Sequence, residues 1–145
     1  MPFFIDTSAL FKRYQMEKGT DKISDLIEKS SENIFISSLT IVEVISNLKR
    51  LHEIDHLTSN RDFIQQRLFF YNDIERFEIA ILDVTTDDII KAEELILTRY
   101  MKPVDAIQVA IALNNFSVKP TFVSSDQKLC LIAHQEGLPI FNPED

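Results

Sequence analysis

Residues 1–14 of the chain are MPFFIDTSALFKRY, and the run PFFID at positions 2–6 puts an acid directly after a short apolar segment. A continuous apolar run of this length is typical of a parallel strand that is buried on both faces. Asp6 then marks the carboxyl end of this strand, with Thr7 and Ser8 beside it. Two interpretations of Asp6 stay open at this point: it caps a following helix, or it forms one corner of a charged site.

Four further segments have the character of short apolar strands, namely ENIFISS (32–38), EIAILDV (78–84), KPTFVSSD (119–126) and LPIF (138–141). Helical patterns lie between them at 20–31, 38–54, 59–77, 85–101, 102–116 and 127–137. This alternation predicts an α/β fold in which helices cover both sides of a parallel sheet. In such sheets, ligands bind beyond the carboxyl ends of the strands.

Length and composition set broad limits on the function. The 145 residues predict a single domain over positions 1–145. A net charge of −8 argues against broad, charge-driven coating of nucleic acid. The one cysteine, Cys130, is expected at a buried helix position and fits a reducing compartment. No apolar run approaches the ~18 residues of a membrane span, so we expect a cytoplasmic protein without a membrane partner.

Four acids stand at unusual positions. Asp6 and Asp126 follow strands, Glu43 lies among apolar helical neighbours, and Asp105 is the only charge in PVDAIQVAIAL (103–113). Each has an ordinary structural interpretation: helix capping for Asp6 and Asp126, and a helix-dipole interaction for Asp105. Glu43 fits such an interpretation least, because a buried unpaired charge needs a partner or a cation. One shared site explains all four acids more economically than four separate roles.

A shared carboxylate site favours a divalent cation. Without one, mutual repulsion would protonate some of the acids. Oxygen ligands suit Mg²⁺ or Mn²⁺, which can activate water and stabilise phosphate charge during in-line displacement. The pattern therefore indicates cleavage of a phosphodiester.

Four segments together resemble the PIN domain family, and in particular the VapC toxins of toxin–antitoxin pairs. They are FFIDTSALFKRY (3–14), SSLTIVEVISNLKR (37–50), KPVDAIQVAIAL (102–113) and FVSSDQKLCLIAHQEGLPIFNP (122–143). The resemblance implies a three-layer α/β/α sandwich with a central parallel sheet of four to five strands. It also implies an endoribonuclease that depends on Mg²⁺ or Mn²⁺, and the usual substrates of the family make tRNA the expected RNA.

The resemblance also assigns residues and partners. It implies that the catalytic and metal-binding acids are Asp6, Glu43, Asp105 and Asp126. The supporting hydroxyls would be Thr7, Ser8, Ser124 and Ser125. A homodimer and a small antitoxin whose arm blocks the active site are further implications. Residues 52–80 match no motif of the family.

Basic and aromatic residues near these acids are candidates for RNA contacts. Lys12 and Arg13 follow Asp6 by about two turns, and Lys49 and Arg50 follow Glu43 in the same way, so each pair is either solvated helix surface or a contact to RNA phosphates. Phe11 and Tyr14 suit core or dimer packing better than base stacking. In FIQQRLFFY (63–71), any apolar stripe left exposed would suit a dimer or an antitoxin helix.

Three other interpretations compete with this one. HEIDH (52–56) matches the H-E-x-x-H pattern of zinc proteases, but it falls where a helix is expected to end. A haloacid-dehalogenase-type phosphatase needs a second Asp where this chain has Ser8. A PIN-like module that binds RNA or a partner without catalysis would not need the intact acid set.

Overall fold

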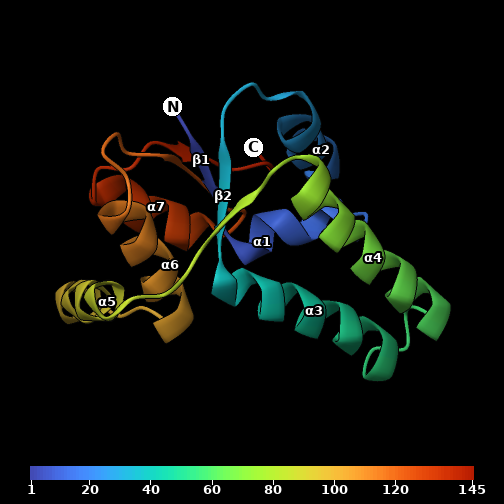
Figure 1. Cartoon of the computed structure of the whole chain (residues 1–145). Coiled ribbons are helices and arrows are strands. Elements are labelled where there is room, and N and C mark those ends of the chain that lie inside the picture. Colours follow the sequence, from blue (N-terminus) through green and yellow to red (C-terminus); the bar gives the residue numbers. More distant parts are fainter.

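Five short parallel strands form one central sheet in the computed structural model, which describes residues 1–145. Their bounds are β1 (Phe3–Ile5), β2 (Ile34–Ser37), β3 (Ala80–Leu82), β4 (Thr121–Val123) and β5 (Ile140–Phe141). The spatial order is β3-β2-β1-β4-β5, and every neighbouring pair is parallel (Figure 1). The predicted parallel sheet of four to five strands is thus confirmed.

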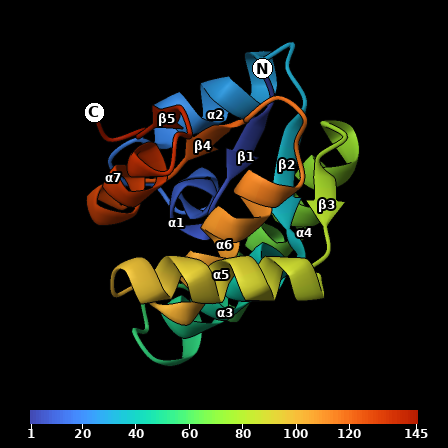
Figure 2. The ribbon, with the colours of Figure 1, turned by 90° about the vertical axis from the view of Figure 1, so that its left-hand side faces the viewer.

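Helices cover both faces of this sheet. One layer contains α1 (Thr7–Leu10), a 3₁₀ turn at Phe11–Arg13, α2 (Thr20–Lys29), α3 (Ser38–Glu53) and α4 (Asn60–Arg76). The other contains α5 (Thr86–Thr98), α6 (Pro103–Asn114) and α7 (Gln127–Gln135). Figures 1 and 2 show the two layers on opposite sides of the strands. This is the three-layer α/β/α sandwich that the sequence analysis predicted.

Successive residues of the three central strands, β1, β2 and β4, pack into different layers, which explains their continuous apolar runs. Phe4 packs with α5, α6 and α7, whereas Ile5 packs with α1 to α4. Phe122 and Val123 divide in the same way on β4, and the rings of Phe4 and Phe122 stack 5.9 Å apart. Because side chains alternate across a strand, a sheet with two cores needs apolar residues at every position.

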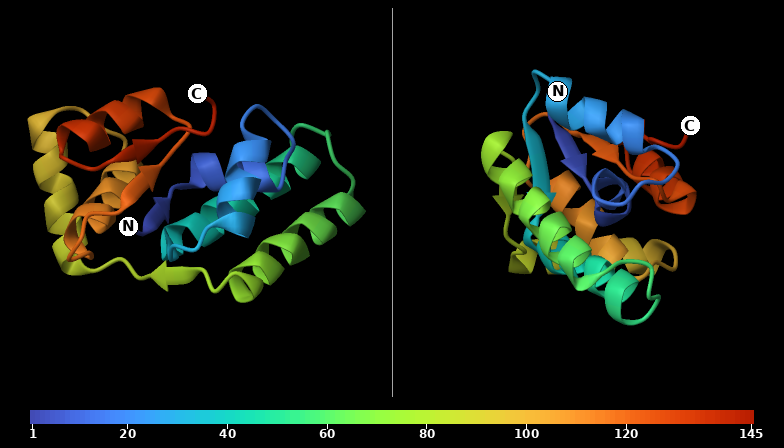
Figure 3. Two further views of the ribbon diagram at one scale, coloured as in Figure 1. Left: turned by 90° about the horizontal axis from the view of Figure 1, so that it is seen from above. Right: turned by 90° about the vertical axis from the view of Figure 1, so that its right-hand side faces the viewer.

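The chain order places a crevice at the carboxyl end of β1. From β1 the chain moves outward to β2 and β3, and it later returns to the other side of β1 as β4. Such a reversal leaves room for a ligand beyond the strand ends. Asp6 follows β1 at this point, while α3 and α4 form a pair that extends away from the sheet (Figure 3). None of the helices has the length and apolar character needed to cross a bilayer.

Candidate active site

Asp6 caps α1 and is also a buried acid at the sheet edge, so both interpretations of this residue apply. Its Oδ1 accepts hydrogen bonds from the backbone N–H of Ala9 (3.1 Å) and the hydroxyl of Ser8 (2.8 Å). Its Oδ2 accepts one from the hydroxyl of Ser124 (2.7 Å). Only 4% of Asp6 is exposed, and every donor to its carboxylate is neutral. The carboxylate is therefore oriented by the protein without being neutralised by it.

Asp126 caps α7 and is linked to Asp6 through Ser124. Its Oδ1 accepts from the backbone N–H of Leu129 (3.1 Å), and its own N–H donates to the Ser124 hydroxyl (3.1 Å). The hydroxyls of Ser8 and Ser124 lie 3.3 Å apart, and Ser125 donates its backbone N–H to the Ser8 hydroxyl. Three of the predicted hydroxyl positions thus meet between these two acids, although Ser125 takes part through its backbone.

Glu43 is positioned by hydroxyl groups on α1 and α3. The Thr7 hydroxyl donates to Glu43 Oε1 at 2.6 Å and lies 3.3 Å from the hydroxyl of Thr40. Thr40 in turn accepts from Gln108 Nε2 at 2.8 Å. Thr40 and Gln108 are both buried, and the sequence analysis did not identify them. Helical spacing could have done so, because each lies three residues from a predicted acid, Glu43 or Asp105, and such residues share a helix face.

The four predicted acids line one cavity of about 180 Å³, although they come from four distant segments of the chain. α6 contributes Asp105 and Gln108, and α3 contributes Glu43 and Asn47. The remaining lining residues are Asp6, Thr7, Ser8 and Asp126. No apolar residue lines the cavity.

The acids in this cavity disfavour one another's charge. Burial raises the pKa of Asp6 to about 6, the hydrogen bonds from Ser124, Ser8 and Ala9 oppose this rise, and the charge of Asp105 adds to it. The pKa of Asp105 is raised as well, first by burial and then by Asp126 and Glu43, while Lys102 opposes the rise. A cation bound here would relieve this repulsion.

The donor set fits a hydrated divalent ion better than a fully caged one. The structure contains no group of three or more His, Cys, Asp or Glu side chains arranged to hold a metal ion. Mg²⁺, however, usually keeps several waters and binds through one or two carboxylates. The cavity offers hard oxygen donors, and the buried Oε1 of Gln108 beside it has no hydrogen-bond partner. These features fit Mg²⁺ or Mn²⁺ and give no soft ligand that would favour zinc.

Lys12 and Arg13 do not fit the RNA contacts suggested for them, because acids of the same chain neutralise both. Lys12 pairs with Glu17 (3.0 Å) and Glu144 (2.8 Å) and is 4% exposed. Arg13 pairs with Glu28 and with the buried Asp73, each at 3.0 Å. These two basic residues therefore hold helices and the C-terminal segment together.

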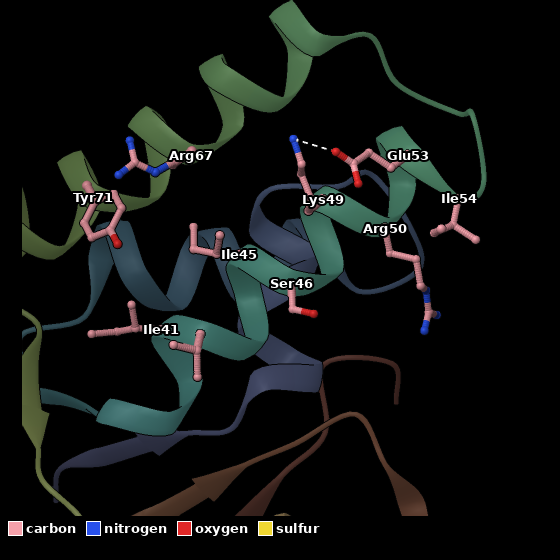
Figure 4. Close-up of a pocket in the computed structure, with 10 residues that line it drawn as sticks. Ile41, Ile45, Ser46, Lys49, Arg50, Glu53, Ile54, Arg67 and Tyr71 are labelled. Atoms are coloured by element: carbon pink, nitrogen blue, oxygen red, sulfur yellow. Dashed lines mark ion pairs between the residues drawn. The ribbon is translucent and has the colours of Figure 1, made fainter.

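Lys49 and Arg50 border a groove of about 670 Å³ between α3 and α4. Lys49 points toward α4 and pairs with Glu53 at 3.0 Å, whereas Arg50 points away from α4 (Figure 4). The Arg50 side chain is 69% exposed, and its nearest acid, Asp55, is 3.9 Å away. Arg50 is three residues beyond Asn47, which lines the acid cavity, so Arg50 continues the same face of α3.

The HEIDH segment does not form a zinc site. Helix α3 ends at Glu53, and His56 has a positive φ of 54° in the turn that follows. His52 uses its Nδ1 in a contact with the carbonyl of Thr58 (2.9 Å). The two histidines therefore do not share a helical face. Tyr14, for which the sequence favours packing over base stacking, is buried and donates its hydroxyl to Asp73 (2.8 Å), so it belongs to the core.

Comparisons with known structures confirm the fold. VapC20 from Mycobacterium tuberculosis, described as a Sarcin-Ricin loop cleaving toxin, is 16% identical with a TM-score of 0.67, over 94% of this chain and 95% of that one. FitAcB from Neisseria gonorrhoeae is 14% identical with a TM-score of 0.73, over 97% of both chains. A toxin–antitoxin complex from Klebsiella pneumoniae is 17% identical with a TM-score of 0.64, over 97% of this chain and 96% of that one.

The family is identified by comparison of the sequence. No curated protein matches the chain. The PIN domain family model matches residues 3–134, which include all four acids of the cavity. This chain therefore belongs to the PIN domain family.

Proposed function

We propose that this protein is an endoribonuclease that depends on Mg²⁺ or Mn²⁺ and cleaves RNA phosphodiester bonds. The observation that carries the proposal is the cavity in which Asp6, Glu43, Asp105 and Asp126 meet without a basic partner among the lining residues. Membership of the PIN domain family and the toxin-like fold support it. We retain tRNA as the expected RNA class and the cytoplasm as the expected location.

The acids and the hydroxyl groups of the cavity have separate roles. The four acids of the cavity, Asp6, Glu43, Asp105 and Asp126, would hold the ion. The ion, when bound, supplies an activated water and stabilises charge on the phosphate. Ser8, Ser124 and the N–H of Ala9 keep the Asp6 oxygens fixed. Thr7 holds Oε1 of Glu43, which leaves Oε2 to accept a proton from a water.

Arg50 is the predicted basic residue whose position best suits a phosphate contact. Its side chain is 69% exposed with Asp55 3.9 Å away, and it lies on the face of α3 that leads from Glu43 and Asn47. Arginine binds phosphate oxygens through two parallel hydrogen bonds, which fixes orientation as well as adding affinity. We therefore assign Arg50, and not Lys12 or Arg13, to the RNA-binding surface.

The test is the replacement of Asp105 by asparagine, which removes a charge and keeps the size of the side chain. We expect Asp105→Asn to abolish Mn²⁺-dependent cleavage of total RNA, while its circular dichroism spectrum matches that of the parent and its melting temperature in metal-free buffer is not lower. The control is Asp21→Asn, which removes an exposed charge on α2, and it should cleave at the parent rate. If Asp105→Asn cleaves as fast as the parent, the mechanism is wrong.

Calorimetry separates this proposal from a module that binds without catalysis. A catalytic site should bind Mn²⁺ in the parent and lose that binding in Asp105→Asn. A module without an active site would show no Mn²⁺ binding that depends on the acids. The phosphatase interpretation has no support, since Ser8 donates to Asp6 at the position where that mechanism needs a second acid.

We also propose that an antitoxin protein binds this chain, with the groove between α3 and α4 as its docking surface. Val42 on α3 (63% exposed) and Tyr71 on α4 (39% exposed) line the groove. Ile64 (49%) and Leu68 (58%) lie outside the groove but continue the Tyr71 face of α4 at helical spacing, as an exposed apolar stripe. Arg50 and Arg67 add positive charge at the groove (Figure 4). An amphipathic segment with acidic residues would complement this surface, and the Klebsiella pneumoniae relative is itself a toxin–antitoxin complex.

Co-expression tests this partner. The product of a short reading frame beside this gene should copurify with the chain and inhibit its cleavage of RNA. The double variant Val42→Asp and Leu68→Asp should lose copurification but keep cleavage. A complex that forms equally well with this variant would place the docking surface elsewhere. We expect the chain alone to be a homodimer, which light scattering would measure.

A further inference from the structure

A second cavity, of about 300 Å³, adjoins the acid cavity between the starts of α6 and α7. We call it the lysine cavity. It shares Asp105 and Asp126 with the acid cavity, so a molecule bound in one lies beside the other. Its other lining residues are two lysines, an exposed tyrosine and an apolar wall, namely Lys102, Lys128, Tyr100, Met101, Leu129 and Ile132.

The two lysines place positive charge at the border of an acidic site. Both are exposed, and neither forms an ion pair, although the chain has a net charge of −8. Lys102 directly precedes α6, and Lys128 is the second residue of α7. Helix N-termini carry positive partial charge and favour acidic side chains, so lysines there are unfavourable for stability alone. Their positive charges add to those of two helix ends, an arrangement that suits phosphate oxygens.

Tyr100 is presented by a segment that is fixed at both ends. The segment connects α5, which ends at Thr98, to α6, which begins at Pro103. Arg99 pairs with Glu136 at 2.8 Å, and Met101 is 5% exposed. Tyr100, between these two anchored residues, is 83% exposed. A large aromatic ring that is exposed to solvent beside a cavity with an apolar wall can serve as a platform on which a nucleobase stacks.

We propose that the lysine cavity binds one unpaired nucleotide of the RNA, next to the phosphate that is cleaved. Its base stacks on Tyr100 against the apolar wall, and Lys102 and Lys128 contact the flanking phosphates. This inference rests on the proposed nuclease function and assigns that site a substrate with a single-stranded segment. The volume is at the lower end of the ~300–1,000 Å³ range of small-molecule pockets, which suits one nucleotide and not a duplex.

RNA binding without cleavage tests the subsite independently of catalysis. All proteins carry Glu43→Gln, which lies outside the lysine cavity and is expected to stop cleavage in Mg²⁺. Fluorescence anisotropy then gives the Kd for a short single-stranded RNA and for an RNA duplex, at several salt concentrations. Tyr100→Ala should weaken single-strand binding about 5- to 150-fold, whereas Tyr100→Phe should bind like the parent. The preference for the single strand should disappear in Tyr100→Ala.

The lysines have a separate signature in the salt dependence. Lys102→Ala and Lys128→Ala should each lower the slope of log K against log salt by about 0.7, the value for one single-strand phosphate contact. The matched control is Lys18→Ala, which removes an exposed lysine elsewhere and should leave the slope unchanged.

The subsite is overturned if Tyr100→Ala and both lysine variants keep the Kd and slope of their parent. If the chain with the native Glu43 cleaves RNA but the Tyr100 and lysine variants bind RNA normally, only the subsite is overturned. If the variants show that RNA binds at the subsite but the chain with the native Glu43 does not cleave RNA, only the nuclease function is overturned. If the protein binds no RNA at all, both proposals are overturned.

Discussion

Of the three buried aspartates of this protein, Asp73 and Asp6 have opposite surroundings. Asp73 on α4 is 1% exposed and meets the guanidinium of Arg13 at 3.0 and 3.3 Å, together with the hydroxyl of Tyr14 at 2.8 Å. Asp6 is 4% exposed and meets only hydroxyls and a backbone N–H, with Asp105 as a charged neighbour. The protein supplies the counter-charge of Asp73 and leaves that of Asp6 to something else.

The comparison teaches how a structural acid differs from a functional one in the same fold. A buried charge with a complete set of partners fixes helices in place, and its removal leaves the partner unpaired. A buried charge with neutral donors alone is held in position at the expense of stability. Neutral donors alone do not identify a functional acid, because the buried Asp88 also accepts only from backbone and amide N–H groups. Asp6 differs because it shares a cavity with three further acids, and a pKa that is raised in such a setting marks a candidate functional site.

The largest expected effect on stability is at the structural acid. Asp73→Asn leaves the Arg13 side chain, which is 6% exposed, with Glu28 as its remaining acid, so we expect a loss of about 3 kcal/mol in the free energy of unfolding. Urea unfolding at neutral pH measures this loss. The control Asp21→Asn removes an exposed charge and should change stability by about 0.5 kcal/mol or less. An unchanged urea midpoint for Asp73→Asn would show that this ion pair does not hold α4 in place.

The functional acid should behave in the opposite way. Burial raises the pKa of Asp6 from 3.8 to about 6, so the folded chain binds this proton more tightly than the unfolded chain does. The destabilising effect is therefore absent below the unfolded pKa and complete above the folded one, which means that stability falls as the pH rises from 3.8 to about 6. In a metal-free buffer, we expect Asp6→Asn to gain up to about 3 kcal/mol over the parent at neutral pH, and little at acidic pH.

Mn²⁺ sharpens the same comparison. A ligand that binds only the folded state raises its stability, by about 2.7 kcal/mol at a hundredfold excess over Kd. The melting temperature of the parent should therefore rise with Mn²⁺, and that of Asp6→Asn should not. Asp73→Asn should keep its response to Mn²⁺ in spite of its lower starting stability. A parent protein that is indifferent to Mn²⁺ would contradict the metal assignment.

The positions of three of the acids could be predicted from the sequence because their signals are local. Asp6 and Asp126 follow apolar strands, and Asp105 opens an otherwise uncharged helix, so parallel topology places all three at one sheet edge. The acid partners of Lys12 and Arg13 could not be predicted in this way. Glu144 lies at the other end of the chain from Lys12, and Asp73 is 60 residues from Arg13. A short basic pair looks the same in the sequence whether its partners are distant acids or RNA.

The smallest expected effect on stability concerns Thr7, whose hydroxyl donates to Glu43 Oε1 at 2.6 Å. Thr7→Val removes this donor while keeping the shape of the side chain, and we expect it to lower the free energy of unfolding by about 1.5 kcal/mol, as for a hydrogen bond to a charged group. Its effect on cleavage should be larger than this loss suggests, because Glu43 has no other donor to hold it toward the cavity. The kinetic signature of a positioning role is a lower kcat with an unchanged KM. Thr7→Ser keeps the hydroxyl and should restore kcat, whereas equal kcat values for Thr7→Val and the parent would show that Glu43 is positioned without Thr7.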